Sequence, residues 1–150
     1  MSVAIPVHMK RGFLGPVPFV VIVDTSRTAL IHVGRKRYEN IMAPLRQATY
    51  LDKLSGTQHA FAEYADRLAG DPLEEVISRH PGSIVVDNDE VLSFALSAGH
   101  DGSTGRPQDH YGFAIKCRRR RYTGSVDRGT DVSGKTPALR EVFGERFRLG

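Results

Sequence analysis

The spacing of hydrophobic residues changes twice along this chain and divides it into three segments. The first segment holds three strand-like runs at residues 3–9, 19–23 and 29–33. The second run is continuous and β-branched, which is typical of a strand buried on both faces. Because residues 24–27 read Asp-Thr-Ser-Arg and supply turn residues, the second and third runs are predicted to form a hairpin.

Helical spacing replaces strand spacing in the middle segment. Residues 35–51 are rich in helix formers, and Pro44 is expected to kink or split that helix. Residues 57–68 predict a second, amphipathic helix. Its apolar face comprises Phe61, Tyr64, Ala65 and Leu68. Asp71 is expected to cap a short third helix that has Pro72 at its first position.

Strand spacing returns in the last segment, at residues 83–86, 90–96, 111–117 and 122–126. Residues 99–109 are rich in glycine and lack large apolar side chains, so they predict a long loop. The polar residues 125–136 predict another loop. A final helix is expected to begin at Pro137. Its apolar face would hold Leu139, Val142, Phe143 and Phe147.

This order of elements favours an α+β fold or a small barrel, because strands come in runs and helices are segregated from them. A length of 150 residues suits one domain, so residues 1–150 are predicted to form a single unit. The helical stretch occupies about residues 35–80 of it. With 40% hydrophobic and 25% charged residues, the composition is that of a folded protein rather than a disordered one.

Charge and cysteine content restrict the setting in which the protein works. The formal net charge of +4 favours acidic partners. Cys117 is the only cysteine, which excludes an intrachain disulfide and fits a reducing compartment. The longest apolar run, residues 17–23, is too short to span a bilayer, and the N-terminal stretch does not resemble a signal peptide. These features predict a cytoplasmic protein without a transmembrane segment.

Four consecutive arginines, Arg118, Arg119, Arg120 and Arg121, are the most unusual feature of the chain. If Phe113, Ile115 and Cys117 face the core, an unbroken strand would bury every second arginine at high cost. We therefore predict a turn at residues 118–120, which puts the arginine run at a hairpin tip. At that tip, each of several guanidinium groups can bind two phosphate oxygens at once. The alternative is a solvated turn without a partner.

Two further basic clusters follow predicted strands. They are Lys10 with Arg11, and Arg35 with Lys36 and Arg37. If both lie at the same end of the fold as the arginine run, the protein has one cationic face that would bind nucleic-acid phosphates in a salt-sensitive way. Aromatic residues that could stack on bases are few near these clusters: Tyr38, Tyr111 and Tyr122.

Three local patterns carry a resemblance to a known family. They are "VVIVDTSRTALIHV" at residues 20–33, "ISRHPGSIVVDNDEVLSFAL" at residues 77–96, and "YGFAIKCRRRRYTGSV" followed by "ALREVFGERF" at residues 111–126 and 138–147. This succession resembles the bacterial and archaeal pleckstrin-homology-like (PH-like) proteins. The resemblance implies a bent, partly open β-barrel or sandwich of about seven strands, with a helical insertion after the third strand and a C-terminal capping helix. It also implies a binding or assembly module whose basic loops meet phosphorylated headgroups.

Catalytic and metal-binding patterns are weak. His100, Asp101, Asp109 and His110 bracket the glycine-rich loop without a defined ligand spacing. The stretch containing Asp87, Asp89 and Glu90 lacks the glycine of a calcium loop. No nucleophile motif or phosphate-binding glycine loop is present. We therefore expect no catalytic residues, metal or cofactor.

The sequence as a whole predicts a non-enzymatic module that contacts an anionic or protein partner through a basic barrel face. The first alternative is an RNA- or ribosome-associated factor that uses the same basic residues. The second is a self-assembling structural or phage-type protein, a homo-oligomer joined by exposed strand edges. Residues 57–82 are acidic, so they could pair with the arginine run within the chain or between copies.

Overall fold

The computed structural model of this chain describes residues 2–10, 15–46, 59–100 and 107–150. It is an α+β structure with one eight-stranded mixed sheet, in the order β4-β3-β2-β1-β7-β6-β5-β8. The strands are β1 (Val3–Lys10), β2 (Pro16–Val23), β3 (Arg27–His32), β4 (Ile84–Asp87), β5 (Val91–His100), β6 (Pro107–Cys117), β7 (Arg121–Val126) and β8 (Phe147–Leu149). The helices are α1 (Arg35–Arg46), α3 (Ala60–Ala69), α4 (Leu73–Arg79) and α5 (Val132–Phe143), with 3-10 turns η2 (Asn88–Glu90) and η3 (Gly144–Arg146).

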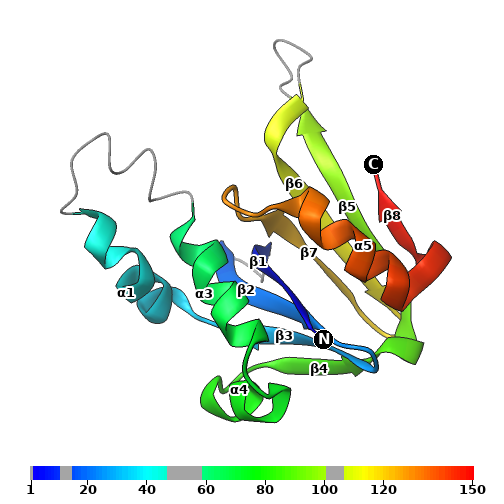
Figure 1. Cartoon of the computed structure of the whole chain (residues 1–150), viewed down its shortest axis with the longest axis horizontal. Helices are drawn as coiled ribbons and strands as arrows, with labels where there is room; N and C mark the ends of the chain where they lie inside the picture. Colours follow the sequence, from blue (N-terminus) through cyan, green and yellow to red (C-terminus); the bar gives the residue numbers. More distant parts are fainter. Residues whose placement is uncertain (1, 11–14, 47–58, 101–106) are drawn as a thin grey trace.

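Strands β1 to β3 are buried on both faces, which explains their continuous apolar runs. Alternate residues enter two separate cores. Val21 packs in the inner core with Leu139 of α5, whereas its neighbour Ile22 packs in the outer core with Phe61 of α3. We call the α5 side of the sheet the inner face and the opposite side the outer face. Figure 1 shows α3 beside β1 to β3 and α5 over the other half of the sheet.

The middle helices depart from the predicted boundaries at two places. Helix α1 runs through Pro44 to Arg46, so the described part of this helix is not split there. Residues 47–51 lie outside the described residues. The predicted cap Asp71 is wrong by one position, because Pro72 precedes the first helical residue of α4 and no side chain caps it. The Asp71 carboxylate instead forms an ion pair with Arg79 at 2.9 Å.

The C-terminal region differs more from the prediction. Helix α5 begins at Val132, so residues 132–136 are helical and Pro137 lies inside the helix rather than at its start. Asp131 explains this earlier start, because its carboxylate accepts a hydrogen bond of 3.0 Å from the Gly134 N–H. Phe147 does not belong to the helix. It begins β8, which runs parallel to β5.

Strands β5 and β6 are longer than expected. They extend to His100 and from Pro107, so much of the predicted loop at residues 99–109 is strand. The regular alternation of buried and exposed residues that strand spacing predicts for β5 is also wrong at its start, because the register shifts between Val91 and Ser93. Val91 and Phe94 are both buried, and Leu92 is 46% exposed. A β-bulge of this kind changes which side chains face the core.

The sheet is not closed into a barrel. Its described edges are β4 and β8, and all strand pairs are antiparallel except β5 with β8. The sheet has eight strands rather than the predicted seven because the spacing of Phe147 predicts helix where the structure has β8. The described helices α1, α3 and α4 all lie between β3 and β4 in the chain. None of the described helices is long and apolar enough to cross a membrane.

Candidate anion-binding face

The arginine run forms the turn between β6 and β7, as predicted. The Cys117 N–H donates a hydrogen bond of 2.8 Å to the Arg120 carbonyl, and Lys116 lies opposite Arg121 in the ladder. Arg118, Arg119, Arg120 and Arg121 are all exposed. The turn avoids the cost of burying a guanidinium group in the core.

Neighbouring elements fix the position of this turn. Phe113, Ile115 and Cys117 are buried on the inner face, so Lys116 projects from the outer face. The Arg118 N–H donates to the Glu90 carbonyl at 3.2 Å, which attaches the turn to η2. The arginine run is therefore held at one end of the sheet by both a strand ladder and a backbone contact.

No described helix covers the outer face of β5 to β8, in contrast to β1 to β3. Cross-strand neighbours on this face are Ser93, Lys116 and Arg121 in one row, and Arg148, Ala95, Ala114 and Thr123 in the next. They surround a shallow depression of about 440 Å³. Its lining consists of Leu92, Ser93, Ala95, Ala114, Lys116, Arg121 and Arg148. Three of these side chains are cationic, and none is acidic.

We define the basic face as Lys116, Arg118, Arg119, Arg120, Arg121 and Arg148. Among the described residues, none of these six side chains forms an ion pair. Three Lys or Arg side chains elsewhere do form ion pairs: Arg27 with Glu74, Arg79 with Asp71, and Lys135 with Asp66. The basic face thus combines a high density of positive charge with unused hydrogen-bond donors.

Of the other predicted basic residues, Arg35, Lys36 and Arg37 follow the end of β3 on α1, and Lys10 ends β1. Lys10 pairs with Pro16 at the start of β2, and a Cβ placed on Gly15 would lie 3.7 Å from the guanidinium of Arg35. Helix α1 begins after the last residue of β3. The arginine turn contacts η2, which follows Asp87, and Asp87 pairs with Arg27, the first residue of β3. Lys36 and Arg37 are exposed on α1, and Arg11 lies outside the described residues. Arg35, Lys36 and Arg37 therefore lie at the end of β3 away from the turn, whereas Lys10 follows Met9, which pairs with Gly124 of β7, three residues after Arg121.

The tyrosines near these clusters do not offer a stacking platform on the basic face. Tyr111 and Tyr122 pack against the inner core. Tyr38 makes edge contacts with His8 and Phe61 at centroid distances of 5.4 and 5.2 Å. All three rings thus contribute to packing.

Cys117 and the candidate metal ligands are the other residues with potential chemistry. Cys117 is buried, as predicted for a small hydrophobic residue, and burial together with the charge of Glu90 raises the pKa of its thiol. In residues 2–10, 15–46, 59–100 and 107–150, no three His, Cys, Asp or Glu side chains gather as metal ligands. The predicted group of His100, Asp101, Asp109 and His110 lies outside the described side chains.

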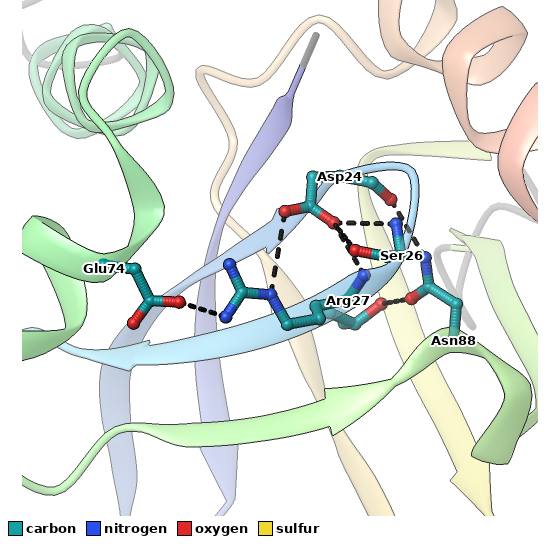
Figure 2. A network of polar contacts seen from close by, with 6 residues as sticks. Asp24, Ser26, Arg27, Glu74 and Asn88 are labelled. Carbon is teal, nitrogen blue, oxygen red and sulfur yellow. Dashed lines mark hydrogen bonds and ion pairs between the residues drawn. The ribbon is translucent and has the colours of Figure 1, made fainter.

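A polar network connects η2 to the β2–β3 hairpin (Figure 2). The Asp24 carboxylate accepts hydrogen bonds from the N–H groups of Ser26 and Arg27 at 2.9 and 2.6 Å. Asn88 donates to the Asp24 carbonyl at 2.9 Å, and Arg27 forms an ion pair with Glu74 of α4. Burial opposes ionisation of Asp24, but the hydrogen bonds from Arg27 and Ser26 and the charge of Arg27 together outweigh it and lower the pKa of this carboxyl. Arg27 is therefore a structural residue and not part of the basic face.

Sequence reasoning missed two members of the face. Lys116 could have been found, because it alternates with Ile115 and Cys117 and must point outward. Arg148 could not, because its strand was taken for the end of a helix. No protein-family model matches the chain, and no curated protein matches its sequence. The functional argument therefore starts from the geometry of the basic face.

Proposed function

We propose that this protein is a non-enzymatic binding module that contacts an anionic partner through the basic face. The observation that carries this proposal is the set of six exposed cations without a described ion pair, three of which line a depression that has no acidic side chain in its lining. Such a group repels itself in the free protein, and a bound anion removes that repulsion. Arginine also offers paired N–H donors to carboxylate or phosphate oxygens.

A second copy of the chain fits this face less well than a separate anion does. Three of the five acidic side chains in residues 57–82 already form ion pairs, whereas Glu63 and Glu75 form none within the described part of the chain. Asp66 contacts Lys135, Asp71 contacts Arg79, and Glu74 contacts Arg27. These contacts favour an external partner over head-to-tail assembly.

The PH-like relationship and the cytoplasmic setting are part of the same proposal. The β2–β3 hairpin and the succession of β6, β7 and α5 support the relationship, with α1 to α4 as an insertion after the third strand. The open sheet and the parallel strand β8 are departures from that pattern. A single buried cysteine supports a reducing compartment.

The proposal is tested with a variant in which all four residues from Arg118 to Arg121 are replaced by glutamine. Three labelled probes are titrated with the wild-type protein and the variant: a polyglutamate peptide, a 20-base-pair duplex, and vesicles containing phosphatidylserine. We expect at least one probe to bind the wild type and to lose at least tenfold in affinity with the variant. Absence of binding to all three probes, or unchanged binding by the variant, would overturn the proposal.

A control must separate local contacts from net charge. The double variant Arg67→Gln/Arg128→Gln removes two exposed arginines that lie outside the basic face. The matched comparison is Arg119→Gln/Arg120→Gln, which removes the same charge from the turn. An equal loss in both double variants would attribute binding to net charge alone and refute a specific face.

A further inference from the structure

The basic face has the layout of a site for a chain of phosphates, and we infer that its partner is the sugar–phosphate backbone of a nucleic-acid duplex. This inference rests on the proposed function and names the class of anion. It follows from the spacing of the cations, from the shape of the surface and from the kinds of side chain that are present on it.

The backbone positions of the cations are spread across four strands of the sheet. Arg148, Lys116 and Arg121 lie on β8, β6 and β7, so the outer two are three strand spacings apart. At roughly 4.8 Å per spacing, this distance is about 14 Å. A single phosphate headgroup would need several donors within hydrogen-bonding distance of one site. A duplex carries one negative charge per about 1.7 Å of axis, so it presents several phosphates over such a span.

The centre of the surface between the cations carries small side chains. Ala95 and Ala114 lie opposite each other, and Thr123 follows Ala114 in the same row. Small side chains in the centre let a bulky backbone approach the sheet while Lys116 and Arg148 reach its phosphates from either side. The arginine turn extends this array past the end of β6.

The missing aromatic platform favours a duplex over a single strand. Proteins that bind single strands draw much of their affinity from bases stacked on aromatic rings. Tyr111 and Tyr122 pack against the inner core on the other side of the sheet, and Phe113 and Phe147 belong to that core. Contacts from lysine and arginine to phosphates need no exposed base, and they position a protein on a duplex without reading its sequence.

The test measures fluorescence anisotropy with four labelled probes: a 20-base-pair DNA duplex, an RNA duplex of the same sequence, the matching single strands, and polyglutamate. About six phosphate contacts predict that affinity for a duplex falls about 1,000-fold between 50 and 200 mM salt. Lys116→Gln/Arg148→Gln should reduce the slope of log K against log salt by about 2. The control Arg67→Gln/Arg128→Gln should keep the wild-type slope.

The two duplex arms decide whether DNA or RNA supplies the backbone, and binding of either supports the inference. Single strands that bind as tightly as duplexes would overturn it, as would a slope that Lys116→Gln/Arg148→Gln leaves unchanged. Binding to polyglutamate or to phosphatidylserine vesicles without duplex binding would overturn this inference and leave the proposed function intact. Failure of every probe would overturn both. Circular dichroism of each variant establishes that it is folded.

Discussion

The Thr28 hydroxyl donates a buried hydrogen bond of 2.7 Å to the Asn88 side-chain oxygen, joining β3 to η2 across 60 positions of sequence. Thr28 is fully buried and Asn88 is 5% exposed. The backbone of Asn88 also takes part, because its carbonyl accepts a hydrogen bond of 2.7 Å from Arg146 of η3. Asn88 thus connects the β2–β3 hairpin, η2 and the C-terminal region. Through Glu90, the same turn holds the arginine run.

Replacing Asn88 with alanine should cost about 2–4 kcal/mol of unfolding free energy, because one buried and one partly buried partner lose their hydrogen bonds. These partners are the Thr28 hydroxyl and the Asp24 carbonyl. Urea denaturation of wild type and variant measures the difference. Asp89→Ala changes the exposed neighbour in the same turn and should stay within about 0.5 kcal/mol of wild type. Equal stabilities for the two variants would contradict a structural role for Asn88.

Gly124 marks the closest approach of β1 and β7. A Cβ at this position would overlap the His8 carbonyl oxygen and lie 2.8 Å from both Met9 Cα and a Phe113 ring carbon. Gly124→Ala should therefore destabilise the fold by about 1–3 kcal/mol, through forced separation of the strands. Gly112→Ala is the matched control, since its Cβ would meet the nearest atom at an ordinary 3.6 Å. A melting-temperature change confined to Gly124→Ala is expected, and equal changes would refute the close-packing argument.

His80 should make the protein less stable in mild acid. Its Nδ1 donates to the Val76 carbonyl at 2.6 Å, and its Nε2 accepts from the Tyr64 hydroxyl at 2.9 Å. Burial lowers the pKa of this imidazole, and the positive charges of Arg37 and Arg79 add to the effect against the opposing Val76 hydrogen bond. The unfolded chain therefore takes up the proton more readily. Stability is fully present above about pH 6.5 and falls as the pH drops through the lower folded pKa.

The measurement for His80 is urea unfolding at pH 7.5 and pH 5.0. In His80→Asn, the loss of stability between the two pH values should be smaller than in wild type, because the titrating group has gone. His59→Asn removes an exposed histidine instead and serves as the control. A wild-type pH dependence in His80→Asn would refute the assignment.

The sequence pattern predicted those helices and strands in which buried residues recur at one regular spacing. Phe61, Ala65 and Leu68 do pack as one helical stripe, and the runs around Val21 and Leu30 are strands. The arginine turn was predictable for the same reason. Buried residues alternate with outward-facing ones through Ile115 and Cys117, so a strand continued further would have buried an arginine at high cost.

Errors arose where a local feature outweighed periodicity. The bulge after Val91 changed which residues of β5 face the core, and the Asp131 cap started α5 before its proline. Phe147 fits a helical face by spacing, but the short strand β8 pairs with Phe94 on β5. Such long-range pairing leaves no local pattern, and for that reason Arg148 was absent from the predicted site.

The Cys117 thiol should be unreactive in the folded protein. It is 8% exposed, and its raised pKa leaves little thiolate to react. Ellman's reagent should label it at pH 8 only at the rate of unfolding, with complete labelling in urea. Because the chain has no other cysteine, the whole signal reports this residue. Fast labelling without denaturant would show that the β6–β7 end opens in the native state.

Reversing one charge on the basic face should stabilise the fold while it weakens binding. Lys116 and Arg121 are directly opposite on β6 and β7, and like charges in that arrangement repel. Lys116→Glu should raise the unfolding free energy by about 0.2–1 kcal/mol at low salt, and the gain should vanish in 1 M salt as screening removes the pair interaction. Lys116→Gln, which only removes the repulsion, should give a smaller gain. A destabilised Lys116→Glu would contradict the like-charge argument. Greater stability of Lys116→Glu together with lost duplex affinity would indicate that Lys116 serves partner binding and not folding.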